Sequence, residues 1–296
     1  MSIGVEPETG TTPTVAEPRP ASDDLPVTVI EPRSGWRIID FRELWRAREL
    51  LAFLVWRDIK IRYKQTAIGA AWAVLQPLAM VAGLTFALGR IASAPDAVVP
   101  YWLFVLTGML PWLLFTGSVN QAAMSVINNH QLVTKVYFPR LLLPLSAVGL
   151  AIIDFCVGAL VLAVSLPIAG ITPTSGLLLV PVALAVLVAA ALGLGLGLSA
   201  LTVRYRDFRV LLPLAIQLGM FLTPGIFLQS VKFGPLGEAI LLANPVQGAV
   251  VNFRAALLGL PPDWLALGIA SVEALVFLVL GAAYFRRVEK GFADVI

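Results

Sequence analysis

The sequence has almost none of the residues that metal sites and thiol chemistry need. It contains one cysteine, Cys156, and one histidine, His130, in 296 residues. Cys156 lies within an apolar run, where a lone thiol is expected to be a small buried hydrophobe. One Cys and one His cannot build a disulfide framework, a zinc cluster or a Cys–His nucleophile pair. The sequence therefore predicts no metal and no cofactor.

A nucleotide-binding motif is also missing. No Gly-x-x-x-x-Gly-Lys-Ser/Thr pattern occurs anywhere in the chain. The alternating glycines of Gly193–Gly197 lack the Lys-Ser/Thr pair and lie within an apolar run, so we expect them to pack helices closely. The chain is not expected to bind or hydrolyse ATP by itself, and we predict that it is not an enzyme.

Charged residues are scarce. They make up 13% of the chain, against about 25% in a typical soluble domain, while 58% of the residues are hydrophobic. Long runs without charge indicate an integral membrane protein. The 21 basic residues exceed the 18 acidic ones, but they flank apolar runs, as membrane orientation requires. We therefore expect the membrane, and no nucleic acid, as the environment of these charges.

The apolar runs predict the fold class. We expect an all-α integral membrane domain over residues 67–296 with six transmembrane helices, because each run can cross about 30 Å of hydrocarbon at about 1.5 Å per residue. The second should be broken at Pro111, and the third should be tilted or kinked at Pro144. The predicted spans are Ile68–Ile91, Pro100–Asn120, Leu141–Ala169, Leu177–Val203, Val210–Leu228 and Trp264–Phe285.

Two segments precede the spans. Residues 1–32 are acidic and rich in Pro and Thr and cannot bury a core, so we expect a disordered tail. They also lack the pattern of a signal peptide, so we expect no processing there. Residues 33–66 are basic, and their apolar positions share one helical face, which predicts an N-terminal amphipathic interfacial helix in the cytoplasmic headgroup plane. The alternative is a helix packed on a protein partner. The positions on this face are Phe41, Leu44, Trp45, Leu51, Val55 and Ile59.

The basic residues also predict the orientation. If the N-terminus is cytoplasmic, all of the 21 lysines and arginines except Arg90, Lys232 and Arg254 fall on the cytoplasmic side. Both termini and the polar segment Asn128–Arg140 are then cytoplasmic. That segment holds the only histidine, and its Phe138-Pro139 step should end one element and begin another. We interpret it as a short helix through which another protein moves this one.

The outer connection between the fifth and sixth spans, Gln229–Asp263, is long and apolar. Asn244-Pro245 is a helix start, and Gly259 before a Pro-Pro pair is a helix end. A second short helix is predicted at Gly237–Leu242. Apolar, Pro-broken chain at membrane depth must lie against protein or a water-filled cavity, so we predict re-entrant outer helices. A surface helix on the outer leaflet is the alternative.

Two carboxylates fall near the middles of predicted spans, Asp154 in the third and Glu273 in the sixth. Such residues usually face a bundle interior. No basic residue lies deep enough in a span to pair with them, so either a proton relay or neutral packing contacts could explain them. A proton-driven secondary transporter using both residues is therefore an alternative function.

Aromatic side chains recur along the second and fifth spans. Sugar rings stack on aromatic faces, so these residues could line a channel for a glycan, whereas an interfacial aromatic belt would explain the outermost ones. The channel-lining candidates are Tyr101, Trp102, Trp112, Phe115, Phe221 and Phe227.

Several stretches together resemble one family, the ABC-2 type permeases that export lipid-linked polysaccharide or polyol phosphate such as O antigen and teichoic acid. The similarity runs from about Arg37 to Ile296. The stretches that carry it are Arg62-Tyr-Lys-Gln-Thr-Ala-Ile-Gly-Ala-Ala-Trp72 with Leu75-Gln76-Pro77, Leu132-Val-Thr-Lys-Val-Tyr-Phe-Pro-Arg140, Thr202-Val-Arg-Tyr-Arg-Asp207 and Phe292-Ala-Asp-Val-Ile296.

The resemblance implies a homodimer that binds two copies of a separate ABC ATP-binding subunit on the cytoplasmic side. It places an interface helix at the N-terminus, a coupling helix in the first cytoplasmic loop and gate helices between the fifth and sixth spans. Asn244, Pro245 and Phe253 would then belong to the outer gate. The coupling candidates are Asn128, His130, Leu132, Lys135 and Tyr137.

Together these observations predict the permease subunit of an ABC exporter in a bacterial inner membrane. Its expected substrate is an undecaprenyl-linked polysaccharide of the O-antigen kind, moved outward and powered by the separate ATPase. An ABC-2 exporter of teichoic acid or of a drug is an alternative within the same family.

Overall fold

The core of the molecule is built around one long buried helix. The structure is a computed structural model that describes residues 41–64, 71–92, 99–172, 174–228 and 234–292. Every regular element within these ranges is a helix, which confirms the predicted all-α class. α4 (Tyr101–Asn128) has 28 residues, most of them buried. The predicted acidic tail, residues 1–32, lies outside the described residues.

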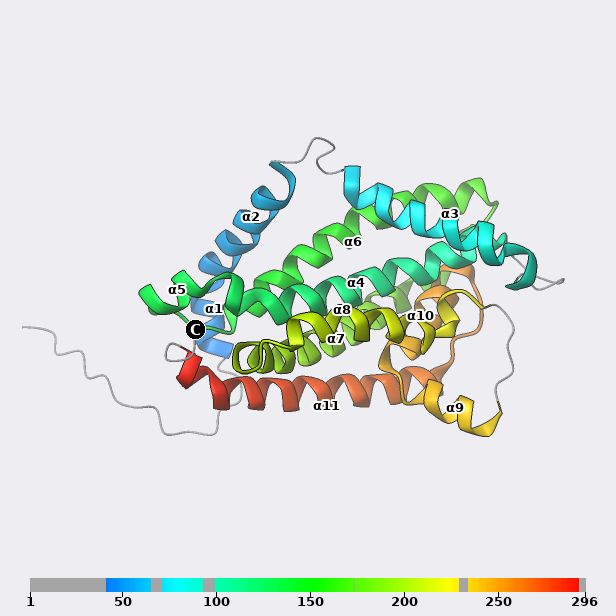
Figure 1. The fold of residues 1–296 in the computed structure, drawn as a ribbon. Helices are drawn as coiled ribbons and strands as arrows, with labels where there is room; N and C mark the ends of the chain where they lie inside the picture. The colour runs from blue at the N-terminus through cyan, green and yellow to red at the C-terminus, as the bar shows by residue number, and fades with distance from the viewer. Residues whose placement is uncertain (1–40, 65–70, 93–98, 173, 229–233, 293–296) are drawn as a thin grey trace, which may run out of the picture. The chain divides into compact units, whose positions relative to one another are not determined.

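Three long helices pack directly on α4 or on its neighbours. α6 (Leu142–Ile168) and α7 (Val180–Arg204) pack along α4, and α11 (Trp264–Val288) packs along α7 (Figure 1). The α7–α11 seam is formed by Gly193 and Gly281, where a Cβ on either glycine would overlap the backbone of the other helix. This confirms the expectation that the glycines of α7 serve close helix packing.

Five described helices are long and apolar enough to cross a membrane, one fewer than predicted. Four of them are α4, α6, α11 and the continuous pair of η2 (Ser175–Leu179) with α7, and the fifth is α3 (Trp72–Ala92). The predicted fifth span, Val210–Leu228, differs. Its helix α8 (Phe208–Phe221) has 14 residues, about 21 Å, which is shorter than the hydrocarbon core.

The end of α8 has a local cause. Pro224 disfavours helical geometry in the residue before it, and Thr223 has φ −122° and ψ 62°. The chain continues as a single 3-10 turn, η3 (Pro224–Ile226). The fifth apolar run is therefore a short helix followed by a break.

Two other predictions about proline were wrong. α4 continues through Pro111 without interruption and runs on to Asn128, past the expected end at Asn120. Pro144 lies in the first turn of α6, where a missing N–H costs nothing because that donor has no partner within the helix. Both prolines were expected to interrupt a helix, but Pro111 lies within a continuous buried helix and Pro144 lies at a helix start.

The N-terminal basic segment forms two helices, α1 (Phe41–Arg46) and α2 (Arg48–Lys64). Leu44, Leu51 and Leu54 pack against an apolar cluster that includes Leu141–Leu143, whereas Trp45 is 70% exposed. α2 also packs on α6, with Val55 in contact at Gly149. α2 thus packs on α6, and its placement in the headgroup plane stays a prediction.

The connection between the fifth and sixth apolar runs contains the two predicted helices, α9 (Pro235–Leu242) and α10 (Pro245–Leu258). The Asn244 side chain accepts a hydrogen bond from the Val246 N–H at 3.0 Å, and Gly259, with φ 67°, ends α10 in the left-handed conformation. The predicted cap, first-turn proline and terminal glycine are confirmed. Figure 1 shows α9 and α10 at one end of the bundle and α5 (His130–Lys135) at the other.

Candidate functional site

The first candidate site is the short helix α5, which follows α4 after a single residue. The Leu132 and Val133 amides donate to the Asn129 carbonyl, at 2.9 and 3.1 Å, and the Asn129 side chain donates to the Ser125 carbonyl at 2.7 Å. These bonds turn the chain out of α4 and restart a helix. Val133 is 5% exposed and Leu132 packs beside it. One face of α5 is therefore fixed to the core.

The other face of α5 points away from the protein. Asn128, His130 and Lys135 are exposed, and Tyr137, just beyond the helix, is fully exposed at 101%. A tyrosine with this exposure among the described residues is typical of an interface, where its ring can be buried by a partner. Four of the five coupling candidates are therefore exposed, and the fifth, Leu132, packs against the core.

The chain after Tyr137 is attached to the C-terminal segment. Arg140 donates a hydrogen bond to the Glu289 carbonyl, and its guanidinium carbon lies 6.0 Å from the centroid of the Phe292 ring. Phe292 is fully buried and packs edge-on against Phe285 of α11 at 5.3 Å between centroids. The polar segment is thus attached to α4 at its start and to the end of α11 at its close.

The second candidate site surrounds η3, where the broken fifth span meets α10. Asn244 donates to the Leu222 carbonyl at 3.1 Å and to the Thr223 hydroxyl at 2.9 Å. Gln247 accepts from the Gly225 amide at 3.1 Å. The α10 helix and its cap thus supply hydrogen-bond partners for the non-helical backbone after α8.

Arg254 is the central residue of this second site, and it is 5% exposed. Its guanidinium donates to the Gly225 carbonyl at 2.7 Å, to the Phe104 carbonyl at 3.1 Å and to the Thr107 hydroxyl at 3.1 Å. Burial lowers the pKa of Arg254 to about 9, so the group stays charged at neutral pH. Its carbon also lies 3.6 Å from the centroid of the Phe104 ring, a short cation–π contact.

Glycine makes room for this guanidinium. A Cβ added at Gly108 would lie 2.6 Å from Arg254 Nη2 and 2.8 Å from the Ile226 Cα. Any side chain here would therefore push both α10 and η3 away from α4. Tyr101, at the start of α4, adds another tie by donating to the Phe227 carbonyl at 2.8 Å. Arg254, Gln247 and Gly108 were not among the predicted site residues.

The aromatic candidates divide into two groups. Tyr101, Trp112 and Phe115 are buried within the protomer, whereas Phe221 is 68% exposed. Trp102 and Phe227 are half-buried, and the Phe221 and Phe227 rings meet edge to face at 6.5 Å between centroids. The rings of the fifth run are thus the accessible ones, together with Trp102.

Asp154 was expected to have no basic partner, and this was wrong. The Arg62 guanidinium lies 2.8 Å from its carboxylate, and the Tyr63 hydroxyl donates to the same group. Both partners come from α2, outside the apolar runs in which we had looked for one. The pair fixes the end of α2 to the middle of α6 and gives the half-buried carboxylate a structural role.

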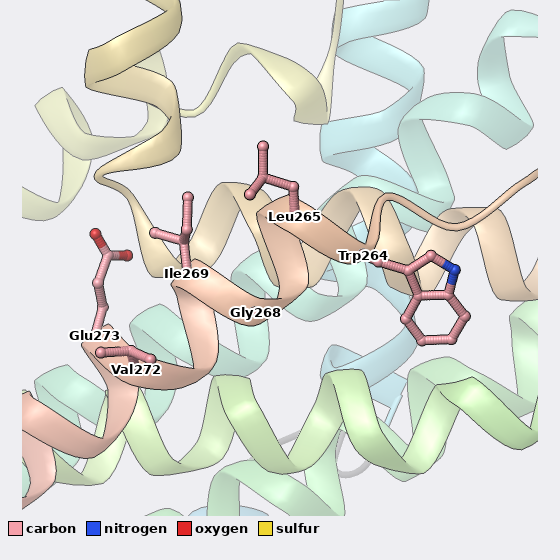
Figure 2. A pocket seen from close by; sticks show the side chains of 6 residues that line it. All are labelled: Trp264, Leu265, Gly268, Ile269, Val272 and Glu273. Atoms are coloured by element: carbon pink, nitrogen blue, oxygen red, sulfur yellow. The ribbon is translucent and has the colours of Figure 1, made fainter.

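Glu273 lies in a different setting, at one end of a shallow hollow of about 350 Å³ on α11. Figure 2 shows the carboxylate of Glu273 and the ring of Trp264 at opposite ends of this row of side chains. Gly268, between them, has no atoms within 4 Å of where its Cβ would be. The Glu273 Oε2 atom is buried and has no hydrogen-bond partner among the described residues.

Comparison with known proteins identifies the family to which this chain belongs. The family profile described as ABC-2 type transporter matches residues 49–258, from the start of α2 to the end of α10. The chain belongs to the ABC-2 type transporter family. It is therefore a multi-pass membrane protein, as its apolar helices also indicate. In ABC-2 transporters the matched region is the membrane-embedded transport part, so the chain is a transport protein.

Individual members of the ABC-2 family match most of the chain. The O-antigen export system permease protein RfbA of Klebsiella pneumoniae is 27% identical over 254 residues, which cover 84% of this chain and 95% of the relative. The O-antigen export system permease protein RfbA of Myxococcus xanthus is 29% identical over 260 residues, which cover 86% and 98%. The similarity thus extends over nearly the full length of these ABC-2 permeases.

Proposed function

We propose that the chain is the permease subunit of an ABC exporter that moves an undecaprenyl-linked, O-antigen-like polysaccharide outward across a bacterial inner membrane. The single observation that carries this proposal is the near full-length similarity to permeases named for O-antigen export. The absence of a Walker A pattern from the sequence agrees with a separate ATP-binding subunit.

The exposed face of α5 is the proposed docking surface for that ATPase. His130, Lys135 and Tyr137 would be buried by it, while Val133 transmits force to the core. Because α5 continues α4 after one residue, a push on α5 acts on a buried helix about 42 Å long. Packed helices move as rigid bodies, so α4 can carry this movement to the outer end.

The proposed passage runs along the exposed side of α8, between two copies of the chain. Phe221, Phe227 and Trp102 are the accessible aromatic residues there, and a sugar ring can slide over such faces without strong binding. Tyr101, Trp112 and Phe115 would join this lining only if the helices that cover them moved apart. The outer-gate residues Asn244, Pro245 and Phe253 would then lie at the outer end of this passage.

The proposal is tested in proteoliposomes and in cells. The purified chain should form a complex with an ATPase encoded beside it, and glycan export should require both proteins and ATP. Export by the chain alone, driven by a proton gradient, would overturn the proposal. Asp154→Asn and Glu273→Gln separate the two mechanisms, because an ATP-driven exporter should keep most of its export in both variants, whereas a proton-driven transporter should lose it.

A further inference from the structure

One apolar cluster joins α5 to the ends of four long helices. Its buried members include Val126 of α4, Val133 of α5, Leu142 of α6, Val203 of α7 and Phe285 of α11. α5 is therefore in contact with a core that several helices share. Apolar burial is not directional, so this cluster alone does not decide which of the helices follows a push on α5.

Directional bonds connect the chain after α5 to the end of α11. Arg140 donates a hydrogen bond to the Glu289 carbonyl of the short turn η4 (Glu289–Gly291). The Glu289 carboxylate in turn lies 3.0 Å from the guanidinium of Arg286, a residue of α11. Only 16% of the Glu289 side chain is exposed, so this pair is shielded from the solvent that weakens surface ion pairs. Arg140 is thus bound to a turn that is itself fixed to α11.

The helix α1 joins the same series of contacts. Arg286 also lies 3.9 Å from the Glu43 carboxylate of α1. Leu44, the next residue, packs against the apolar cluster that contains Val133 and Phe285. Polar contacts therefore connect α1, the end of α11 and the chain after α5, three segments that lie far apart in sequence.

α11 cannot follow Arg140 without moving α7 as well. The backbones of these two helices meet at Gly193 and Gly281, and closely packed elements move as rigid bodies. A displacement of Arg140 would therefore reach both α11 and α7. The chain that runs directly from α5 through Asn129 reaches a third long helix, α4.

We propose that Arg140 is a positioning residue that links α5 to the α11–α7 pair, so that a push on α5 moves these two helices together with α4. This inference rests on the proposed docking of an ATPase on α5 and deepens it, because it names a second route for the movement. Without the Arg140 bond, α5 would still bind the ATPase and push on α4. The α11–α7 pair would no longer follow.

The first test measures how much polysaccharide is exported per ATP hydrolysed. Surface polysaccharide is measured on cells that make the chain with its ATPase, and ATP hydrolysis is measured in membranes from the same cells, at equal amounts of complex. Arg140→Met should lower this ratio at least about twofold, as for residues that carry coupling between sites. Arg140→Lys, which can still donate to one carbonyl, should restore part of it. Arg287→Met, at an exposed arginine of α11, is the matched control and should leave the ratio unchanged.

A double variant distinguishes a link from a general loss of stability. Arg286→Met removes the ion pair that holds η4, so it should lower the same ratio. Because Arg140 and Arg286 act in series, the double variant should lower the ratio no further than the more severe single variant. The inference is overturned if the two fold-changes multiply. It is also overturned if Arg140→Met lowers only the amount of complex and leaves the ratio unchanged.

A distance measurement tests the link without the glycan. Spin labels at Val136→Cys and Arg287→Cys, both exposed positions, report the separation between the ends of α5 and α11 in a Cys156→Ser background. With Arg140 present, this separation should be equal in the nucleotide-free complex and with a non-hydrolysable ATP analogue bound, whereas in Arg140→Met the two states should differ. A separation that changes with Arg140 present, or that is constant in both backgrounds, overturns the inference. If the unmutated chain with its ATPase exports no polysaccharide, the proposed function fails instead, and the label distances still decide whether the link exists.

Discussion

Removing the guanidinium of Arg254 should strongly destabilise the protein. Arg254→Met keeps much of the side-chain volume but loses three hydrogen bonds of 2.7 to 3.1 Å and the contact with Phe104. Hydrogen bonds to charged groups contribute about 1.5–3 kcal/mol each in soluble proteins, but polar contacts in membrane proteins average about 0.6 kcal/mol. The two values bracket a loss between about 2 and 9 kcal/mol.

The structure decides between these limits. Membrane values are low because freed groups find other partners, but the Gly225 carbonyl lies in a non-helical segment whose other groups are already bonded to Gln247 and Asn244. On the other hand, the desolvation penalty of the buried charge disappears with it. We therefore expect Arg254→Met to lower the free energy of unfolding by about 3–5 kcal/mol, between the two limits.

The assay is denaturant unfolding of the detergent-solubilised protein, with the change in free energy taken from the shift in midpoint. Arg90→Met is the matched control, because Arg90 is an exposed arginine near the end of α3. It should change stability by less than about 0.5 kcal/mol. A loss below about 1 kcal/mol for Arg254→Met, or an equal loss for both variants, would refute the reasoning.

Three further predictions concern the inner half of the protein. Tyr137→Ala with Lys135→Ala should weaken binding of the ATPase by at least about tenfold, as for an aromatic interface anchor. Folding should be unchanged, since Tyr137 is fully exposed. Unchanged binding in a pull-down titration would show that α5 is not part of the interface. Arg62→Ala should lower the unfolding free energy by about 1–2 kcal/mol, more than Asp154→Asn, because it leaves an unpaired carboxylate in α6; equal losses would contradict the pairing. Burial, and then the hydrogen bond to Asp154, raises the pKa of Tyr63 to about 12. The contribution of the neutral Tyr63 hydroxyl to stability should therefore be complete below a pH of about 10 and disappear as the pH rises through about 12. A phenolate absorbance titration that compares the protein with Tyr63→Phe checks this.

Local signals in the sequence predicted the helix boundaries of the outer connection well. Asn244-Pro245 and Gly259 define the start and end of α10 through bonds made within a few residues. α5 was found for a similar reason, since a polar stretch between apolar runs ends at Phe138-Pro139. Capping and proline chemistry depend on neighbours in sequence, so they can be recognised without a structure.

The errors concern residues whose partners are far away in sequence. Arg254 lies in an apolar segment, and its isolation was a usable signal, because a charge at membrane depth usually has a function. Its partners Thr107 and Gly225 could not be identified from local pattern. Likewise, Asp154 finds Arg62 only because α2 packs along α6. Hydropathy also predicted one continuous fifth span where the structure has α8 followed by η3, because hydropathy takes no account of the hydrogen bonds that backbone carbonyls make.

The backbone contact between α7 and α11 provides a fixed reference inside the molecule. At Gly193 and Gly281 no side chain lies between the two helices, so there is no rotamer that could absorb a sliding movement. Spectroscopic probes placed on these two helices should report one constant separation, whatever nucleotide the ATPase holds. The displacement of every other helix can then be measured relative to the α7–α11 pair.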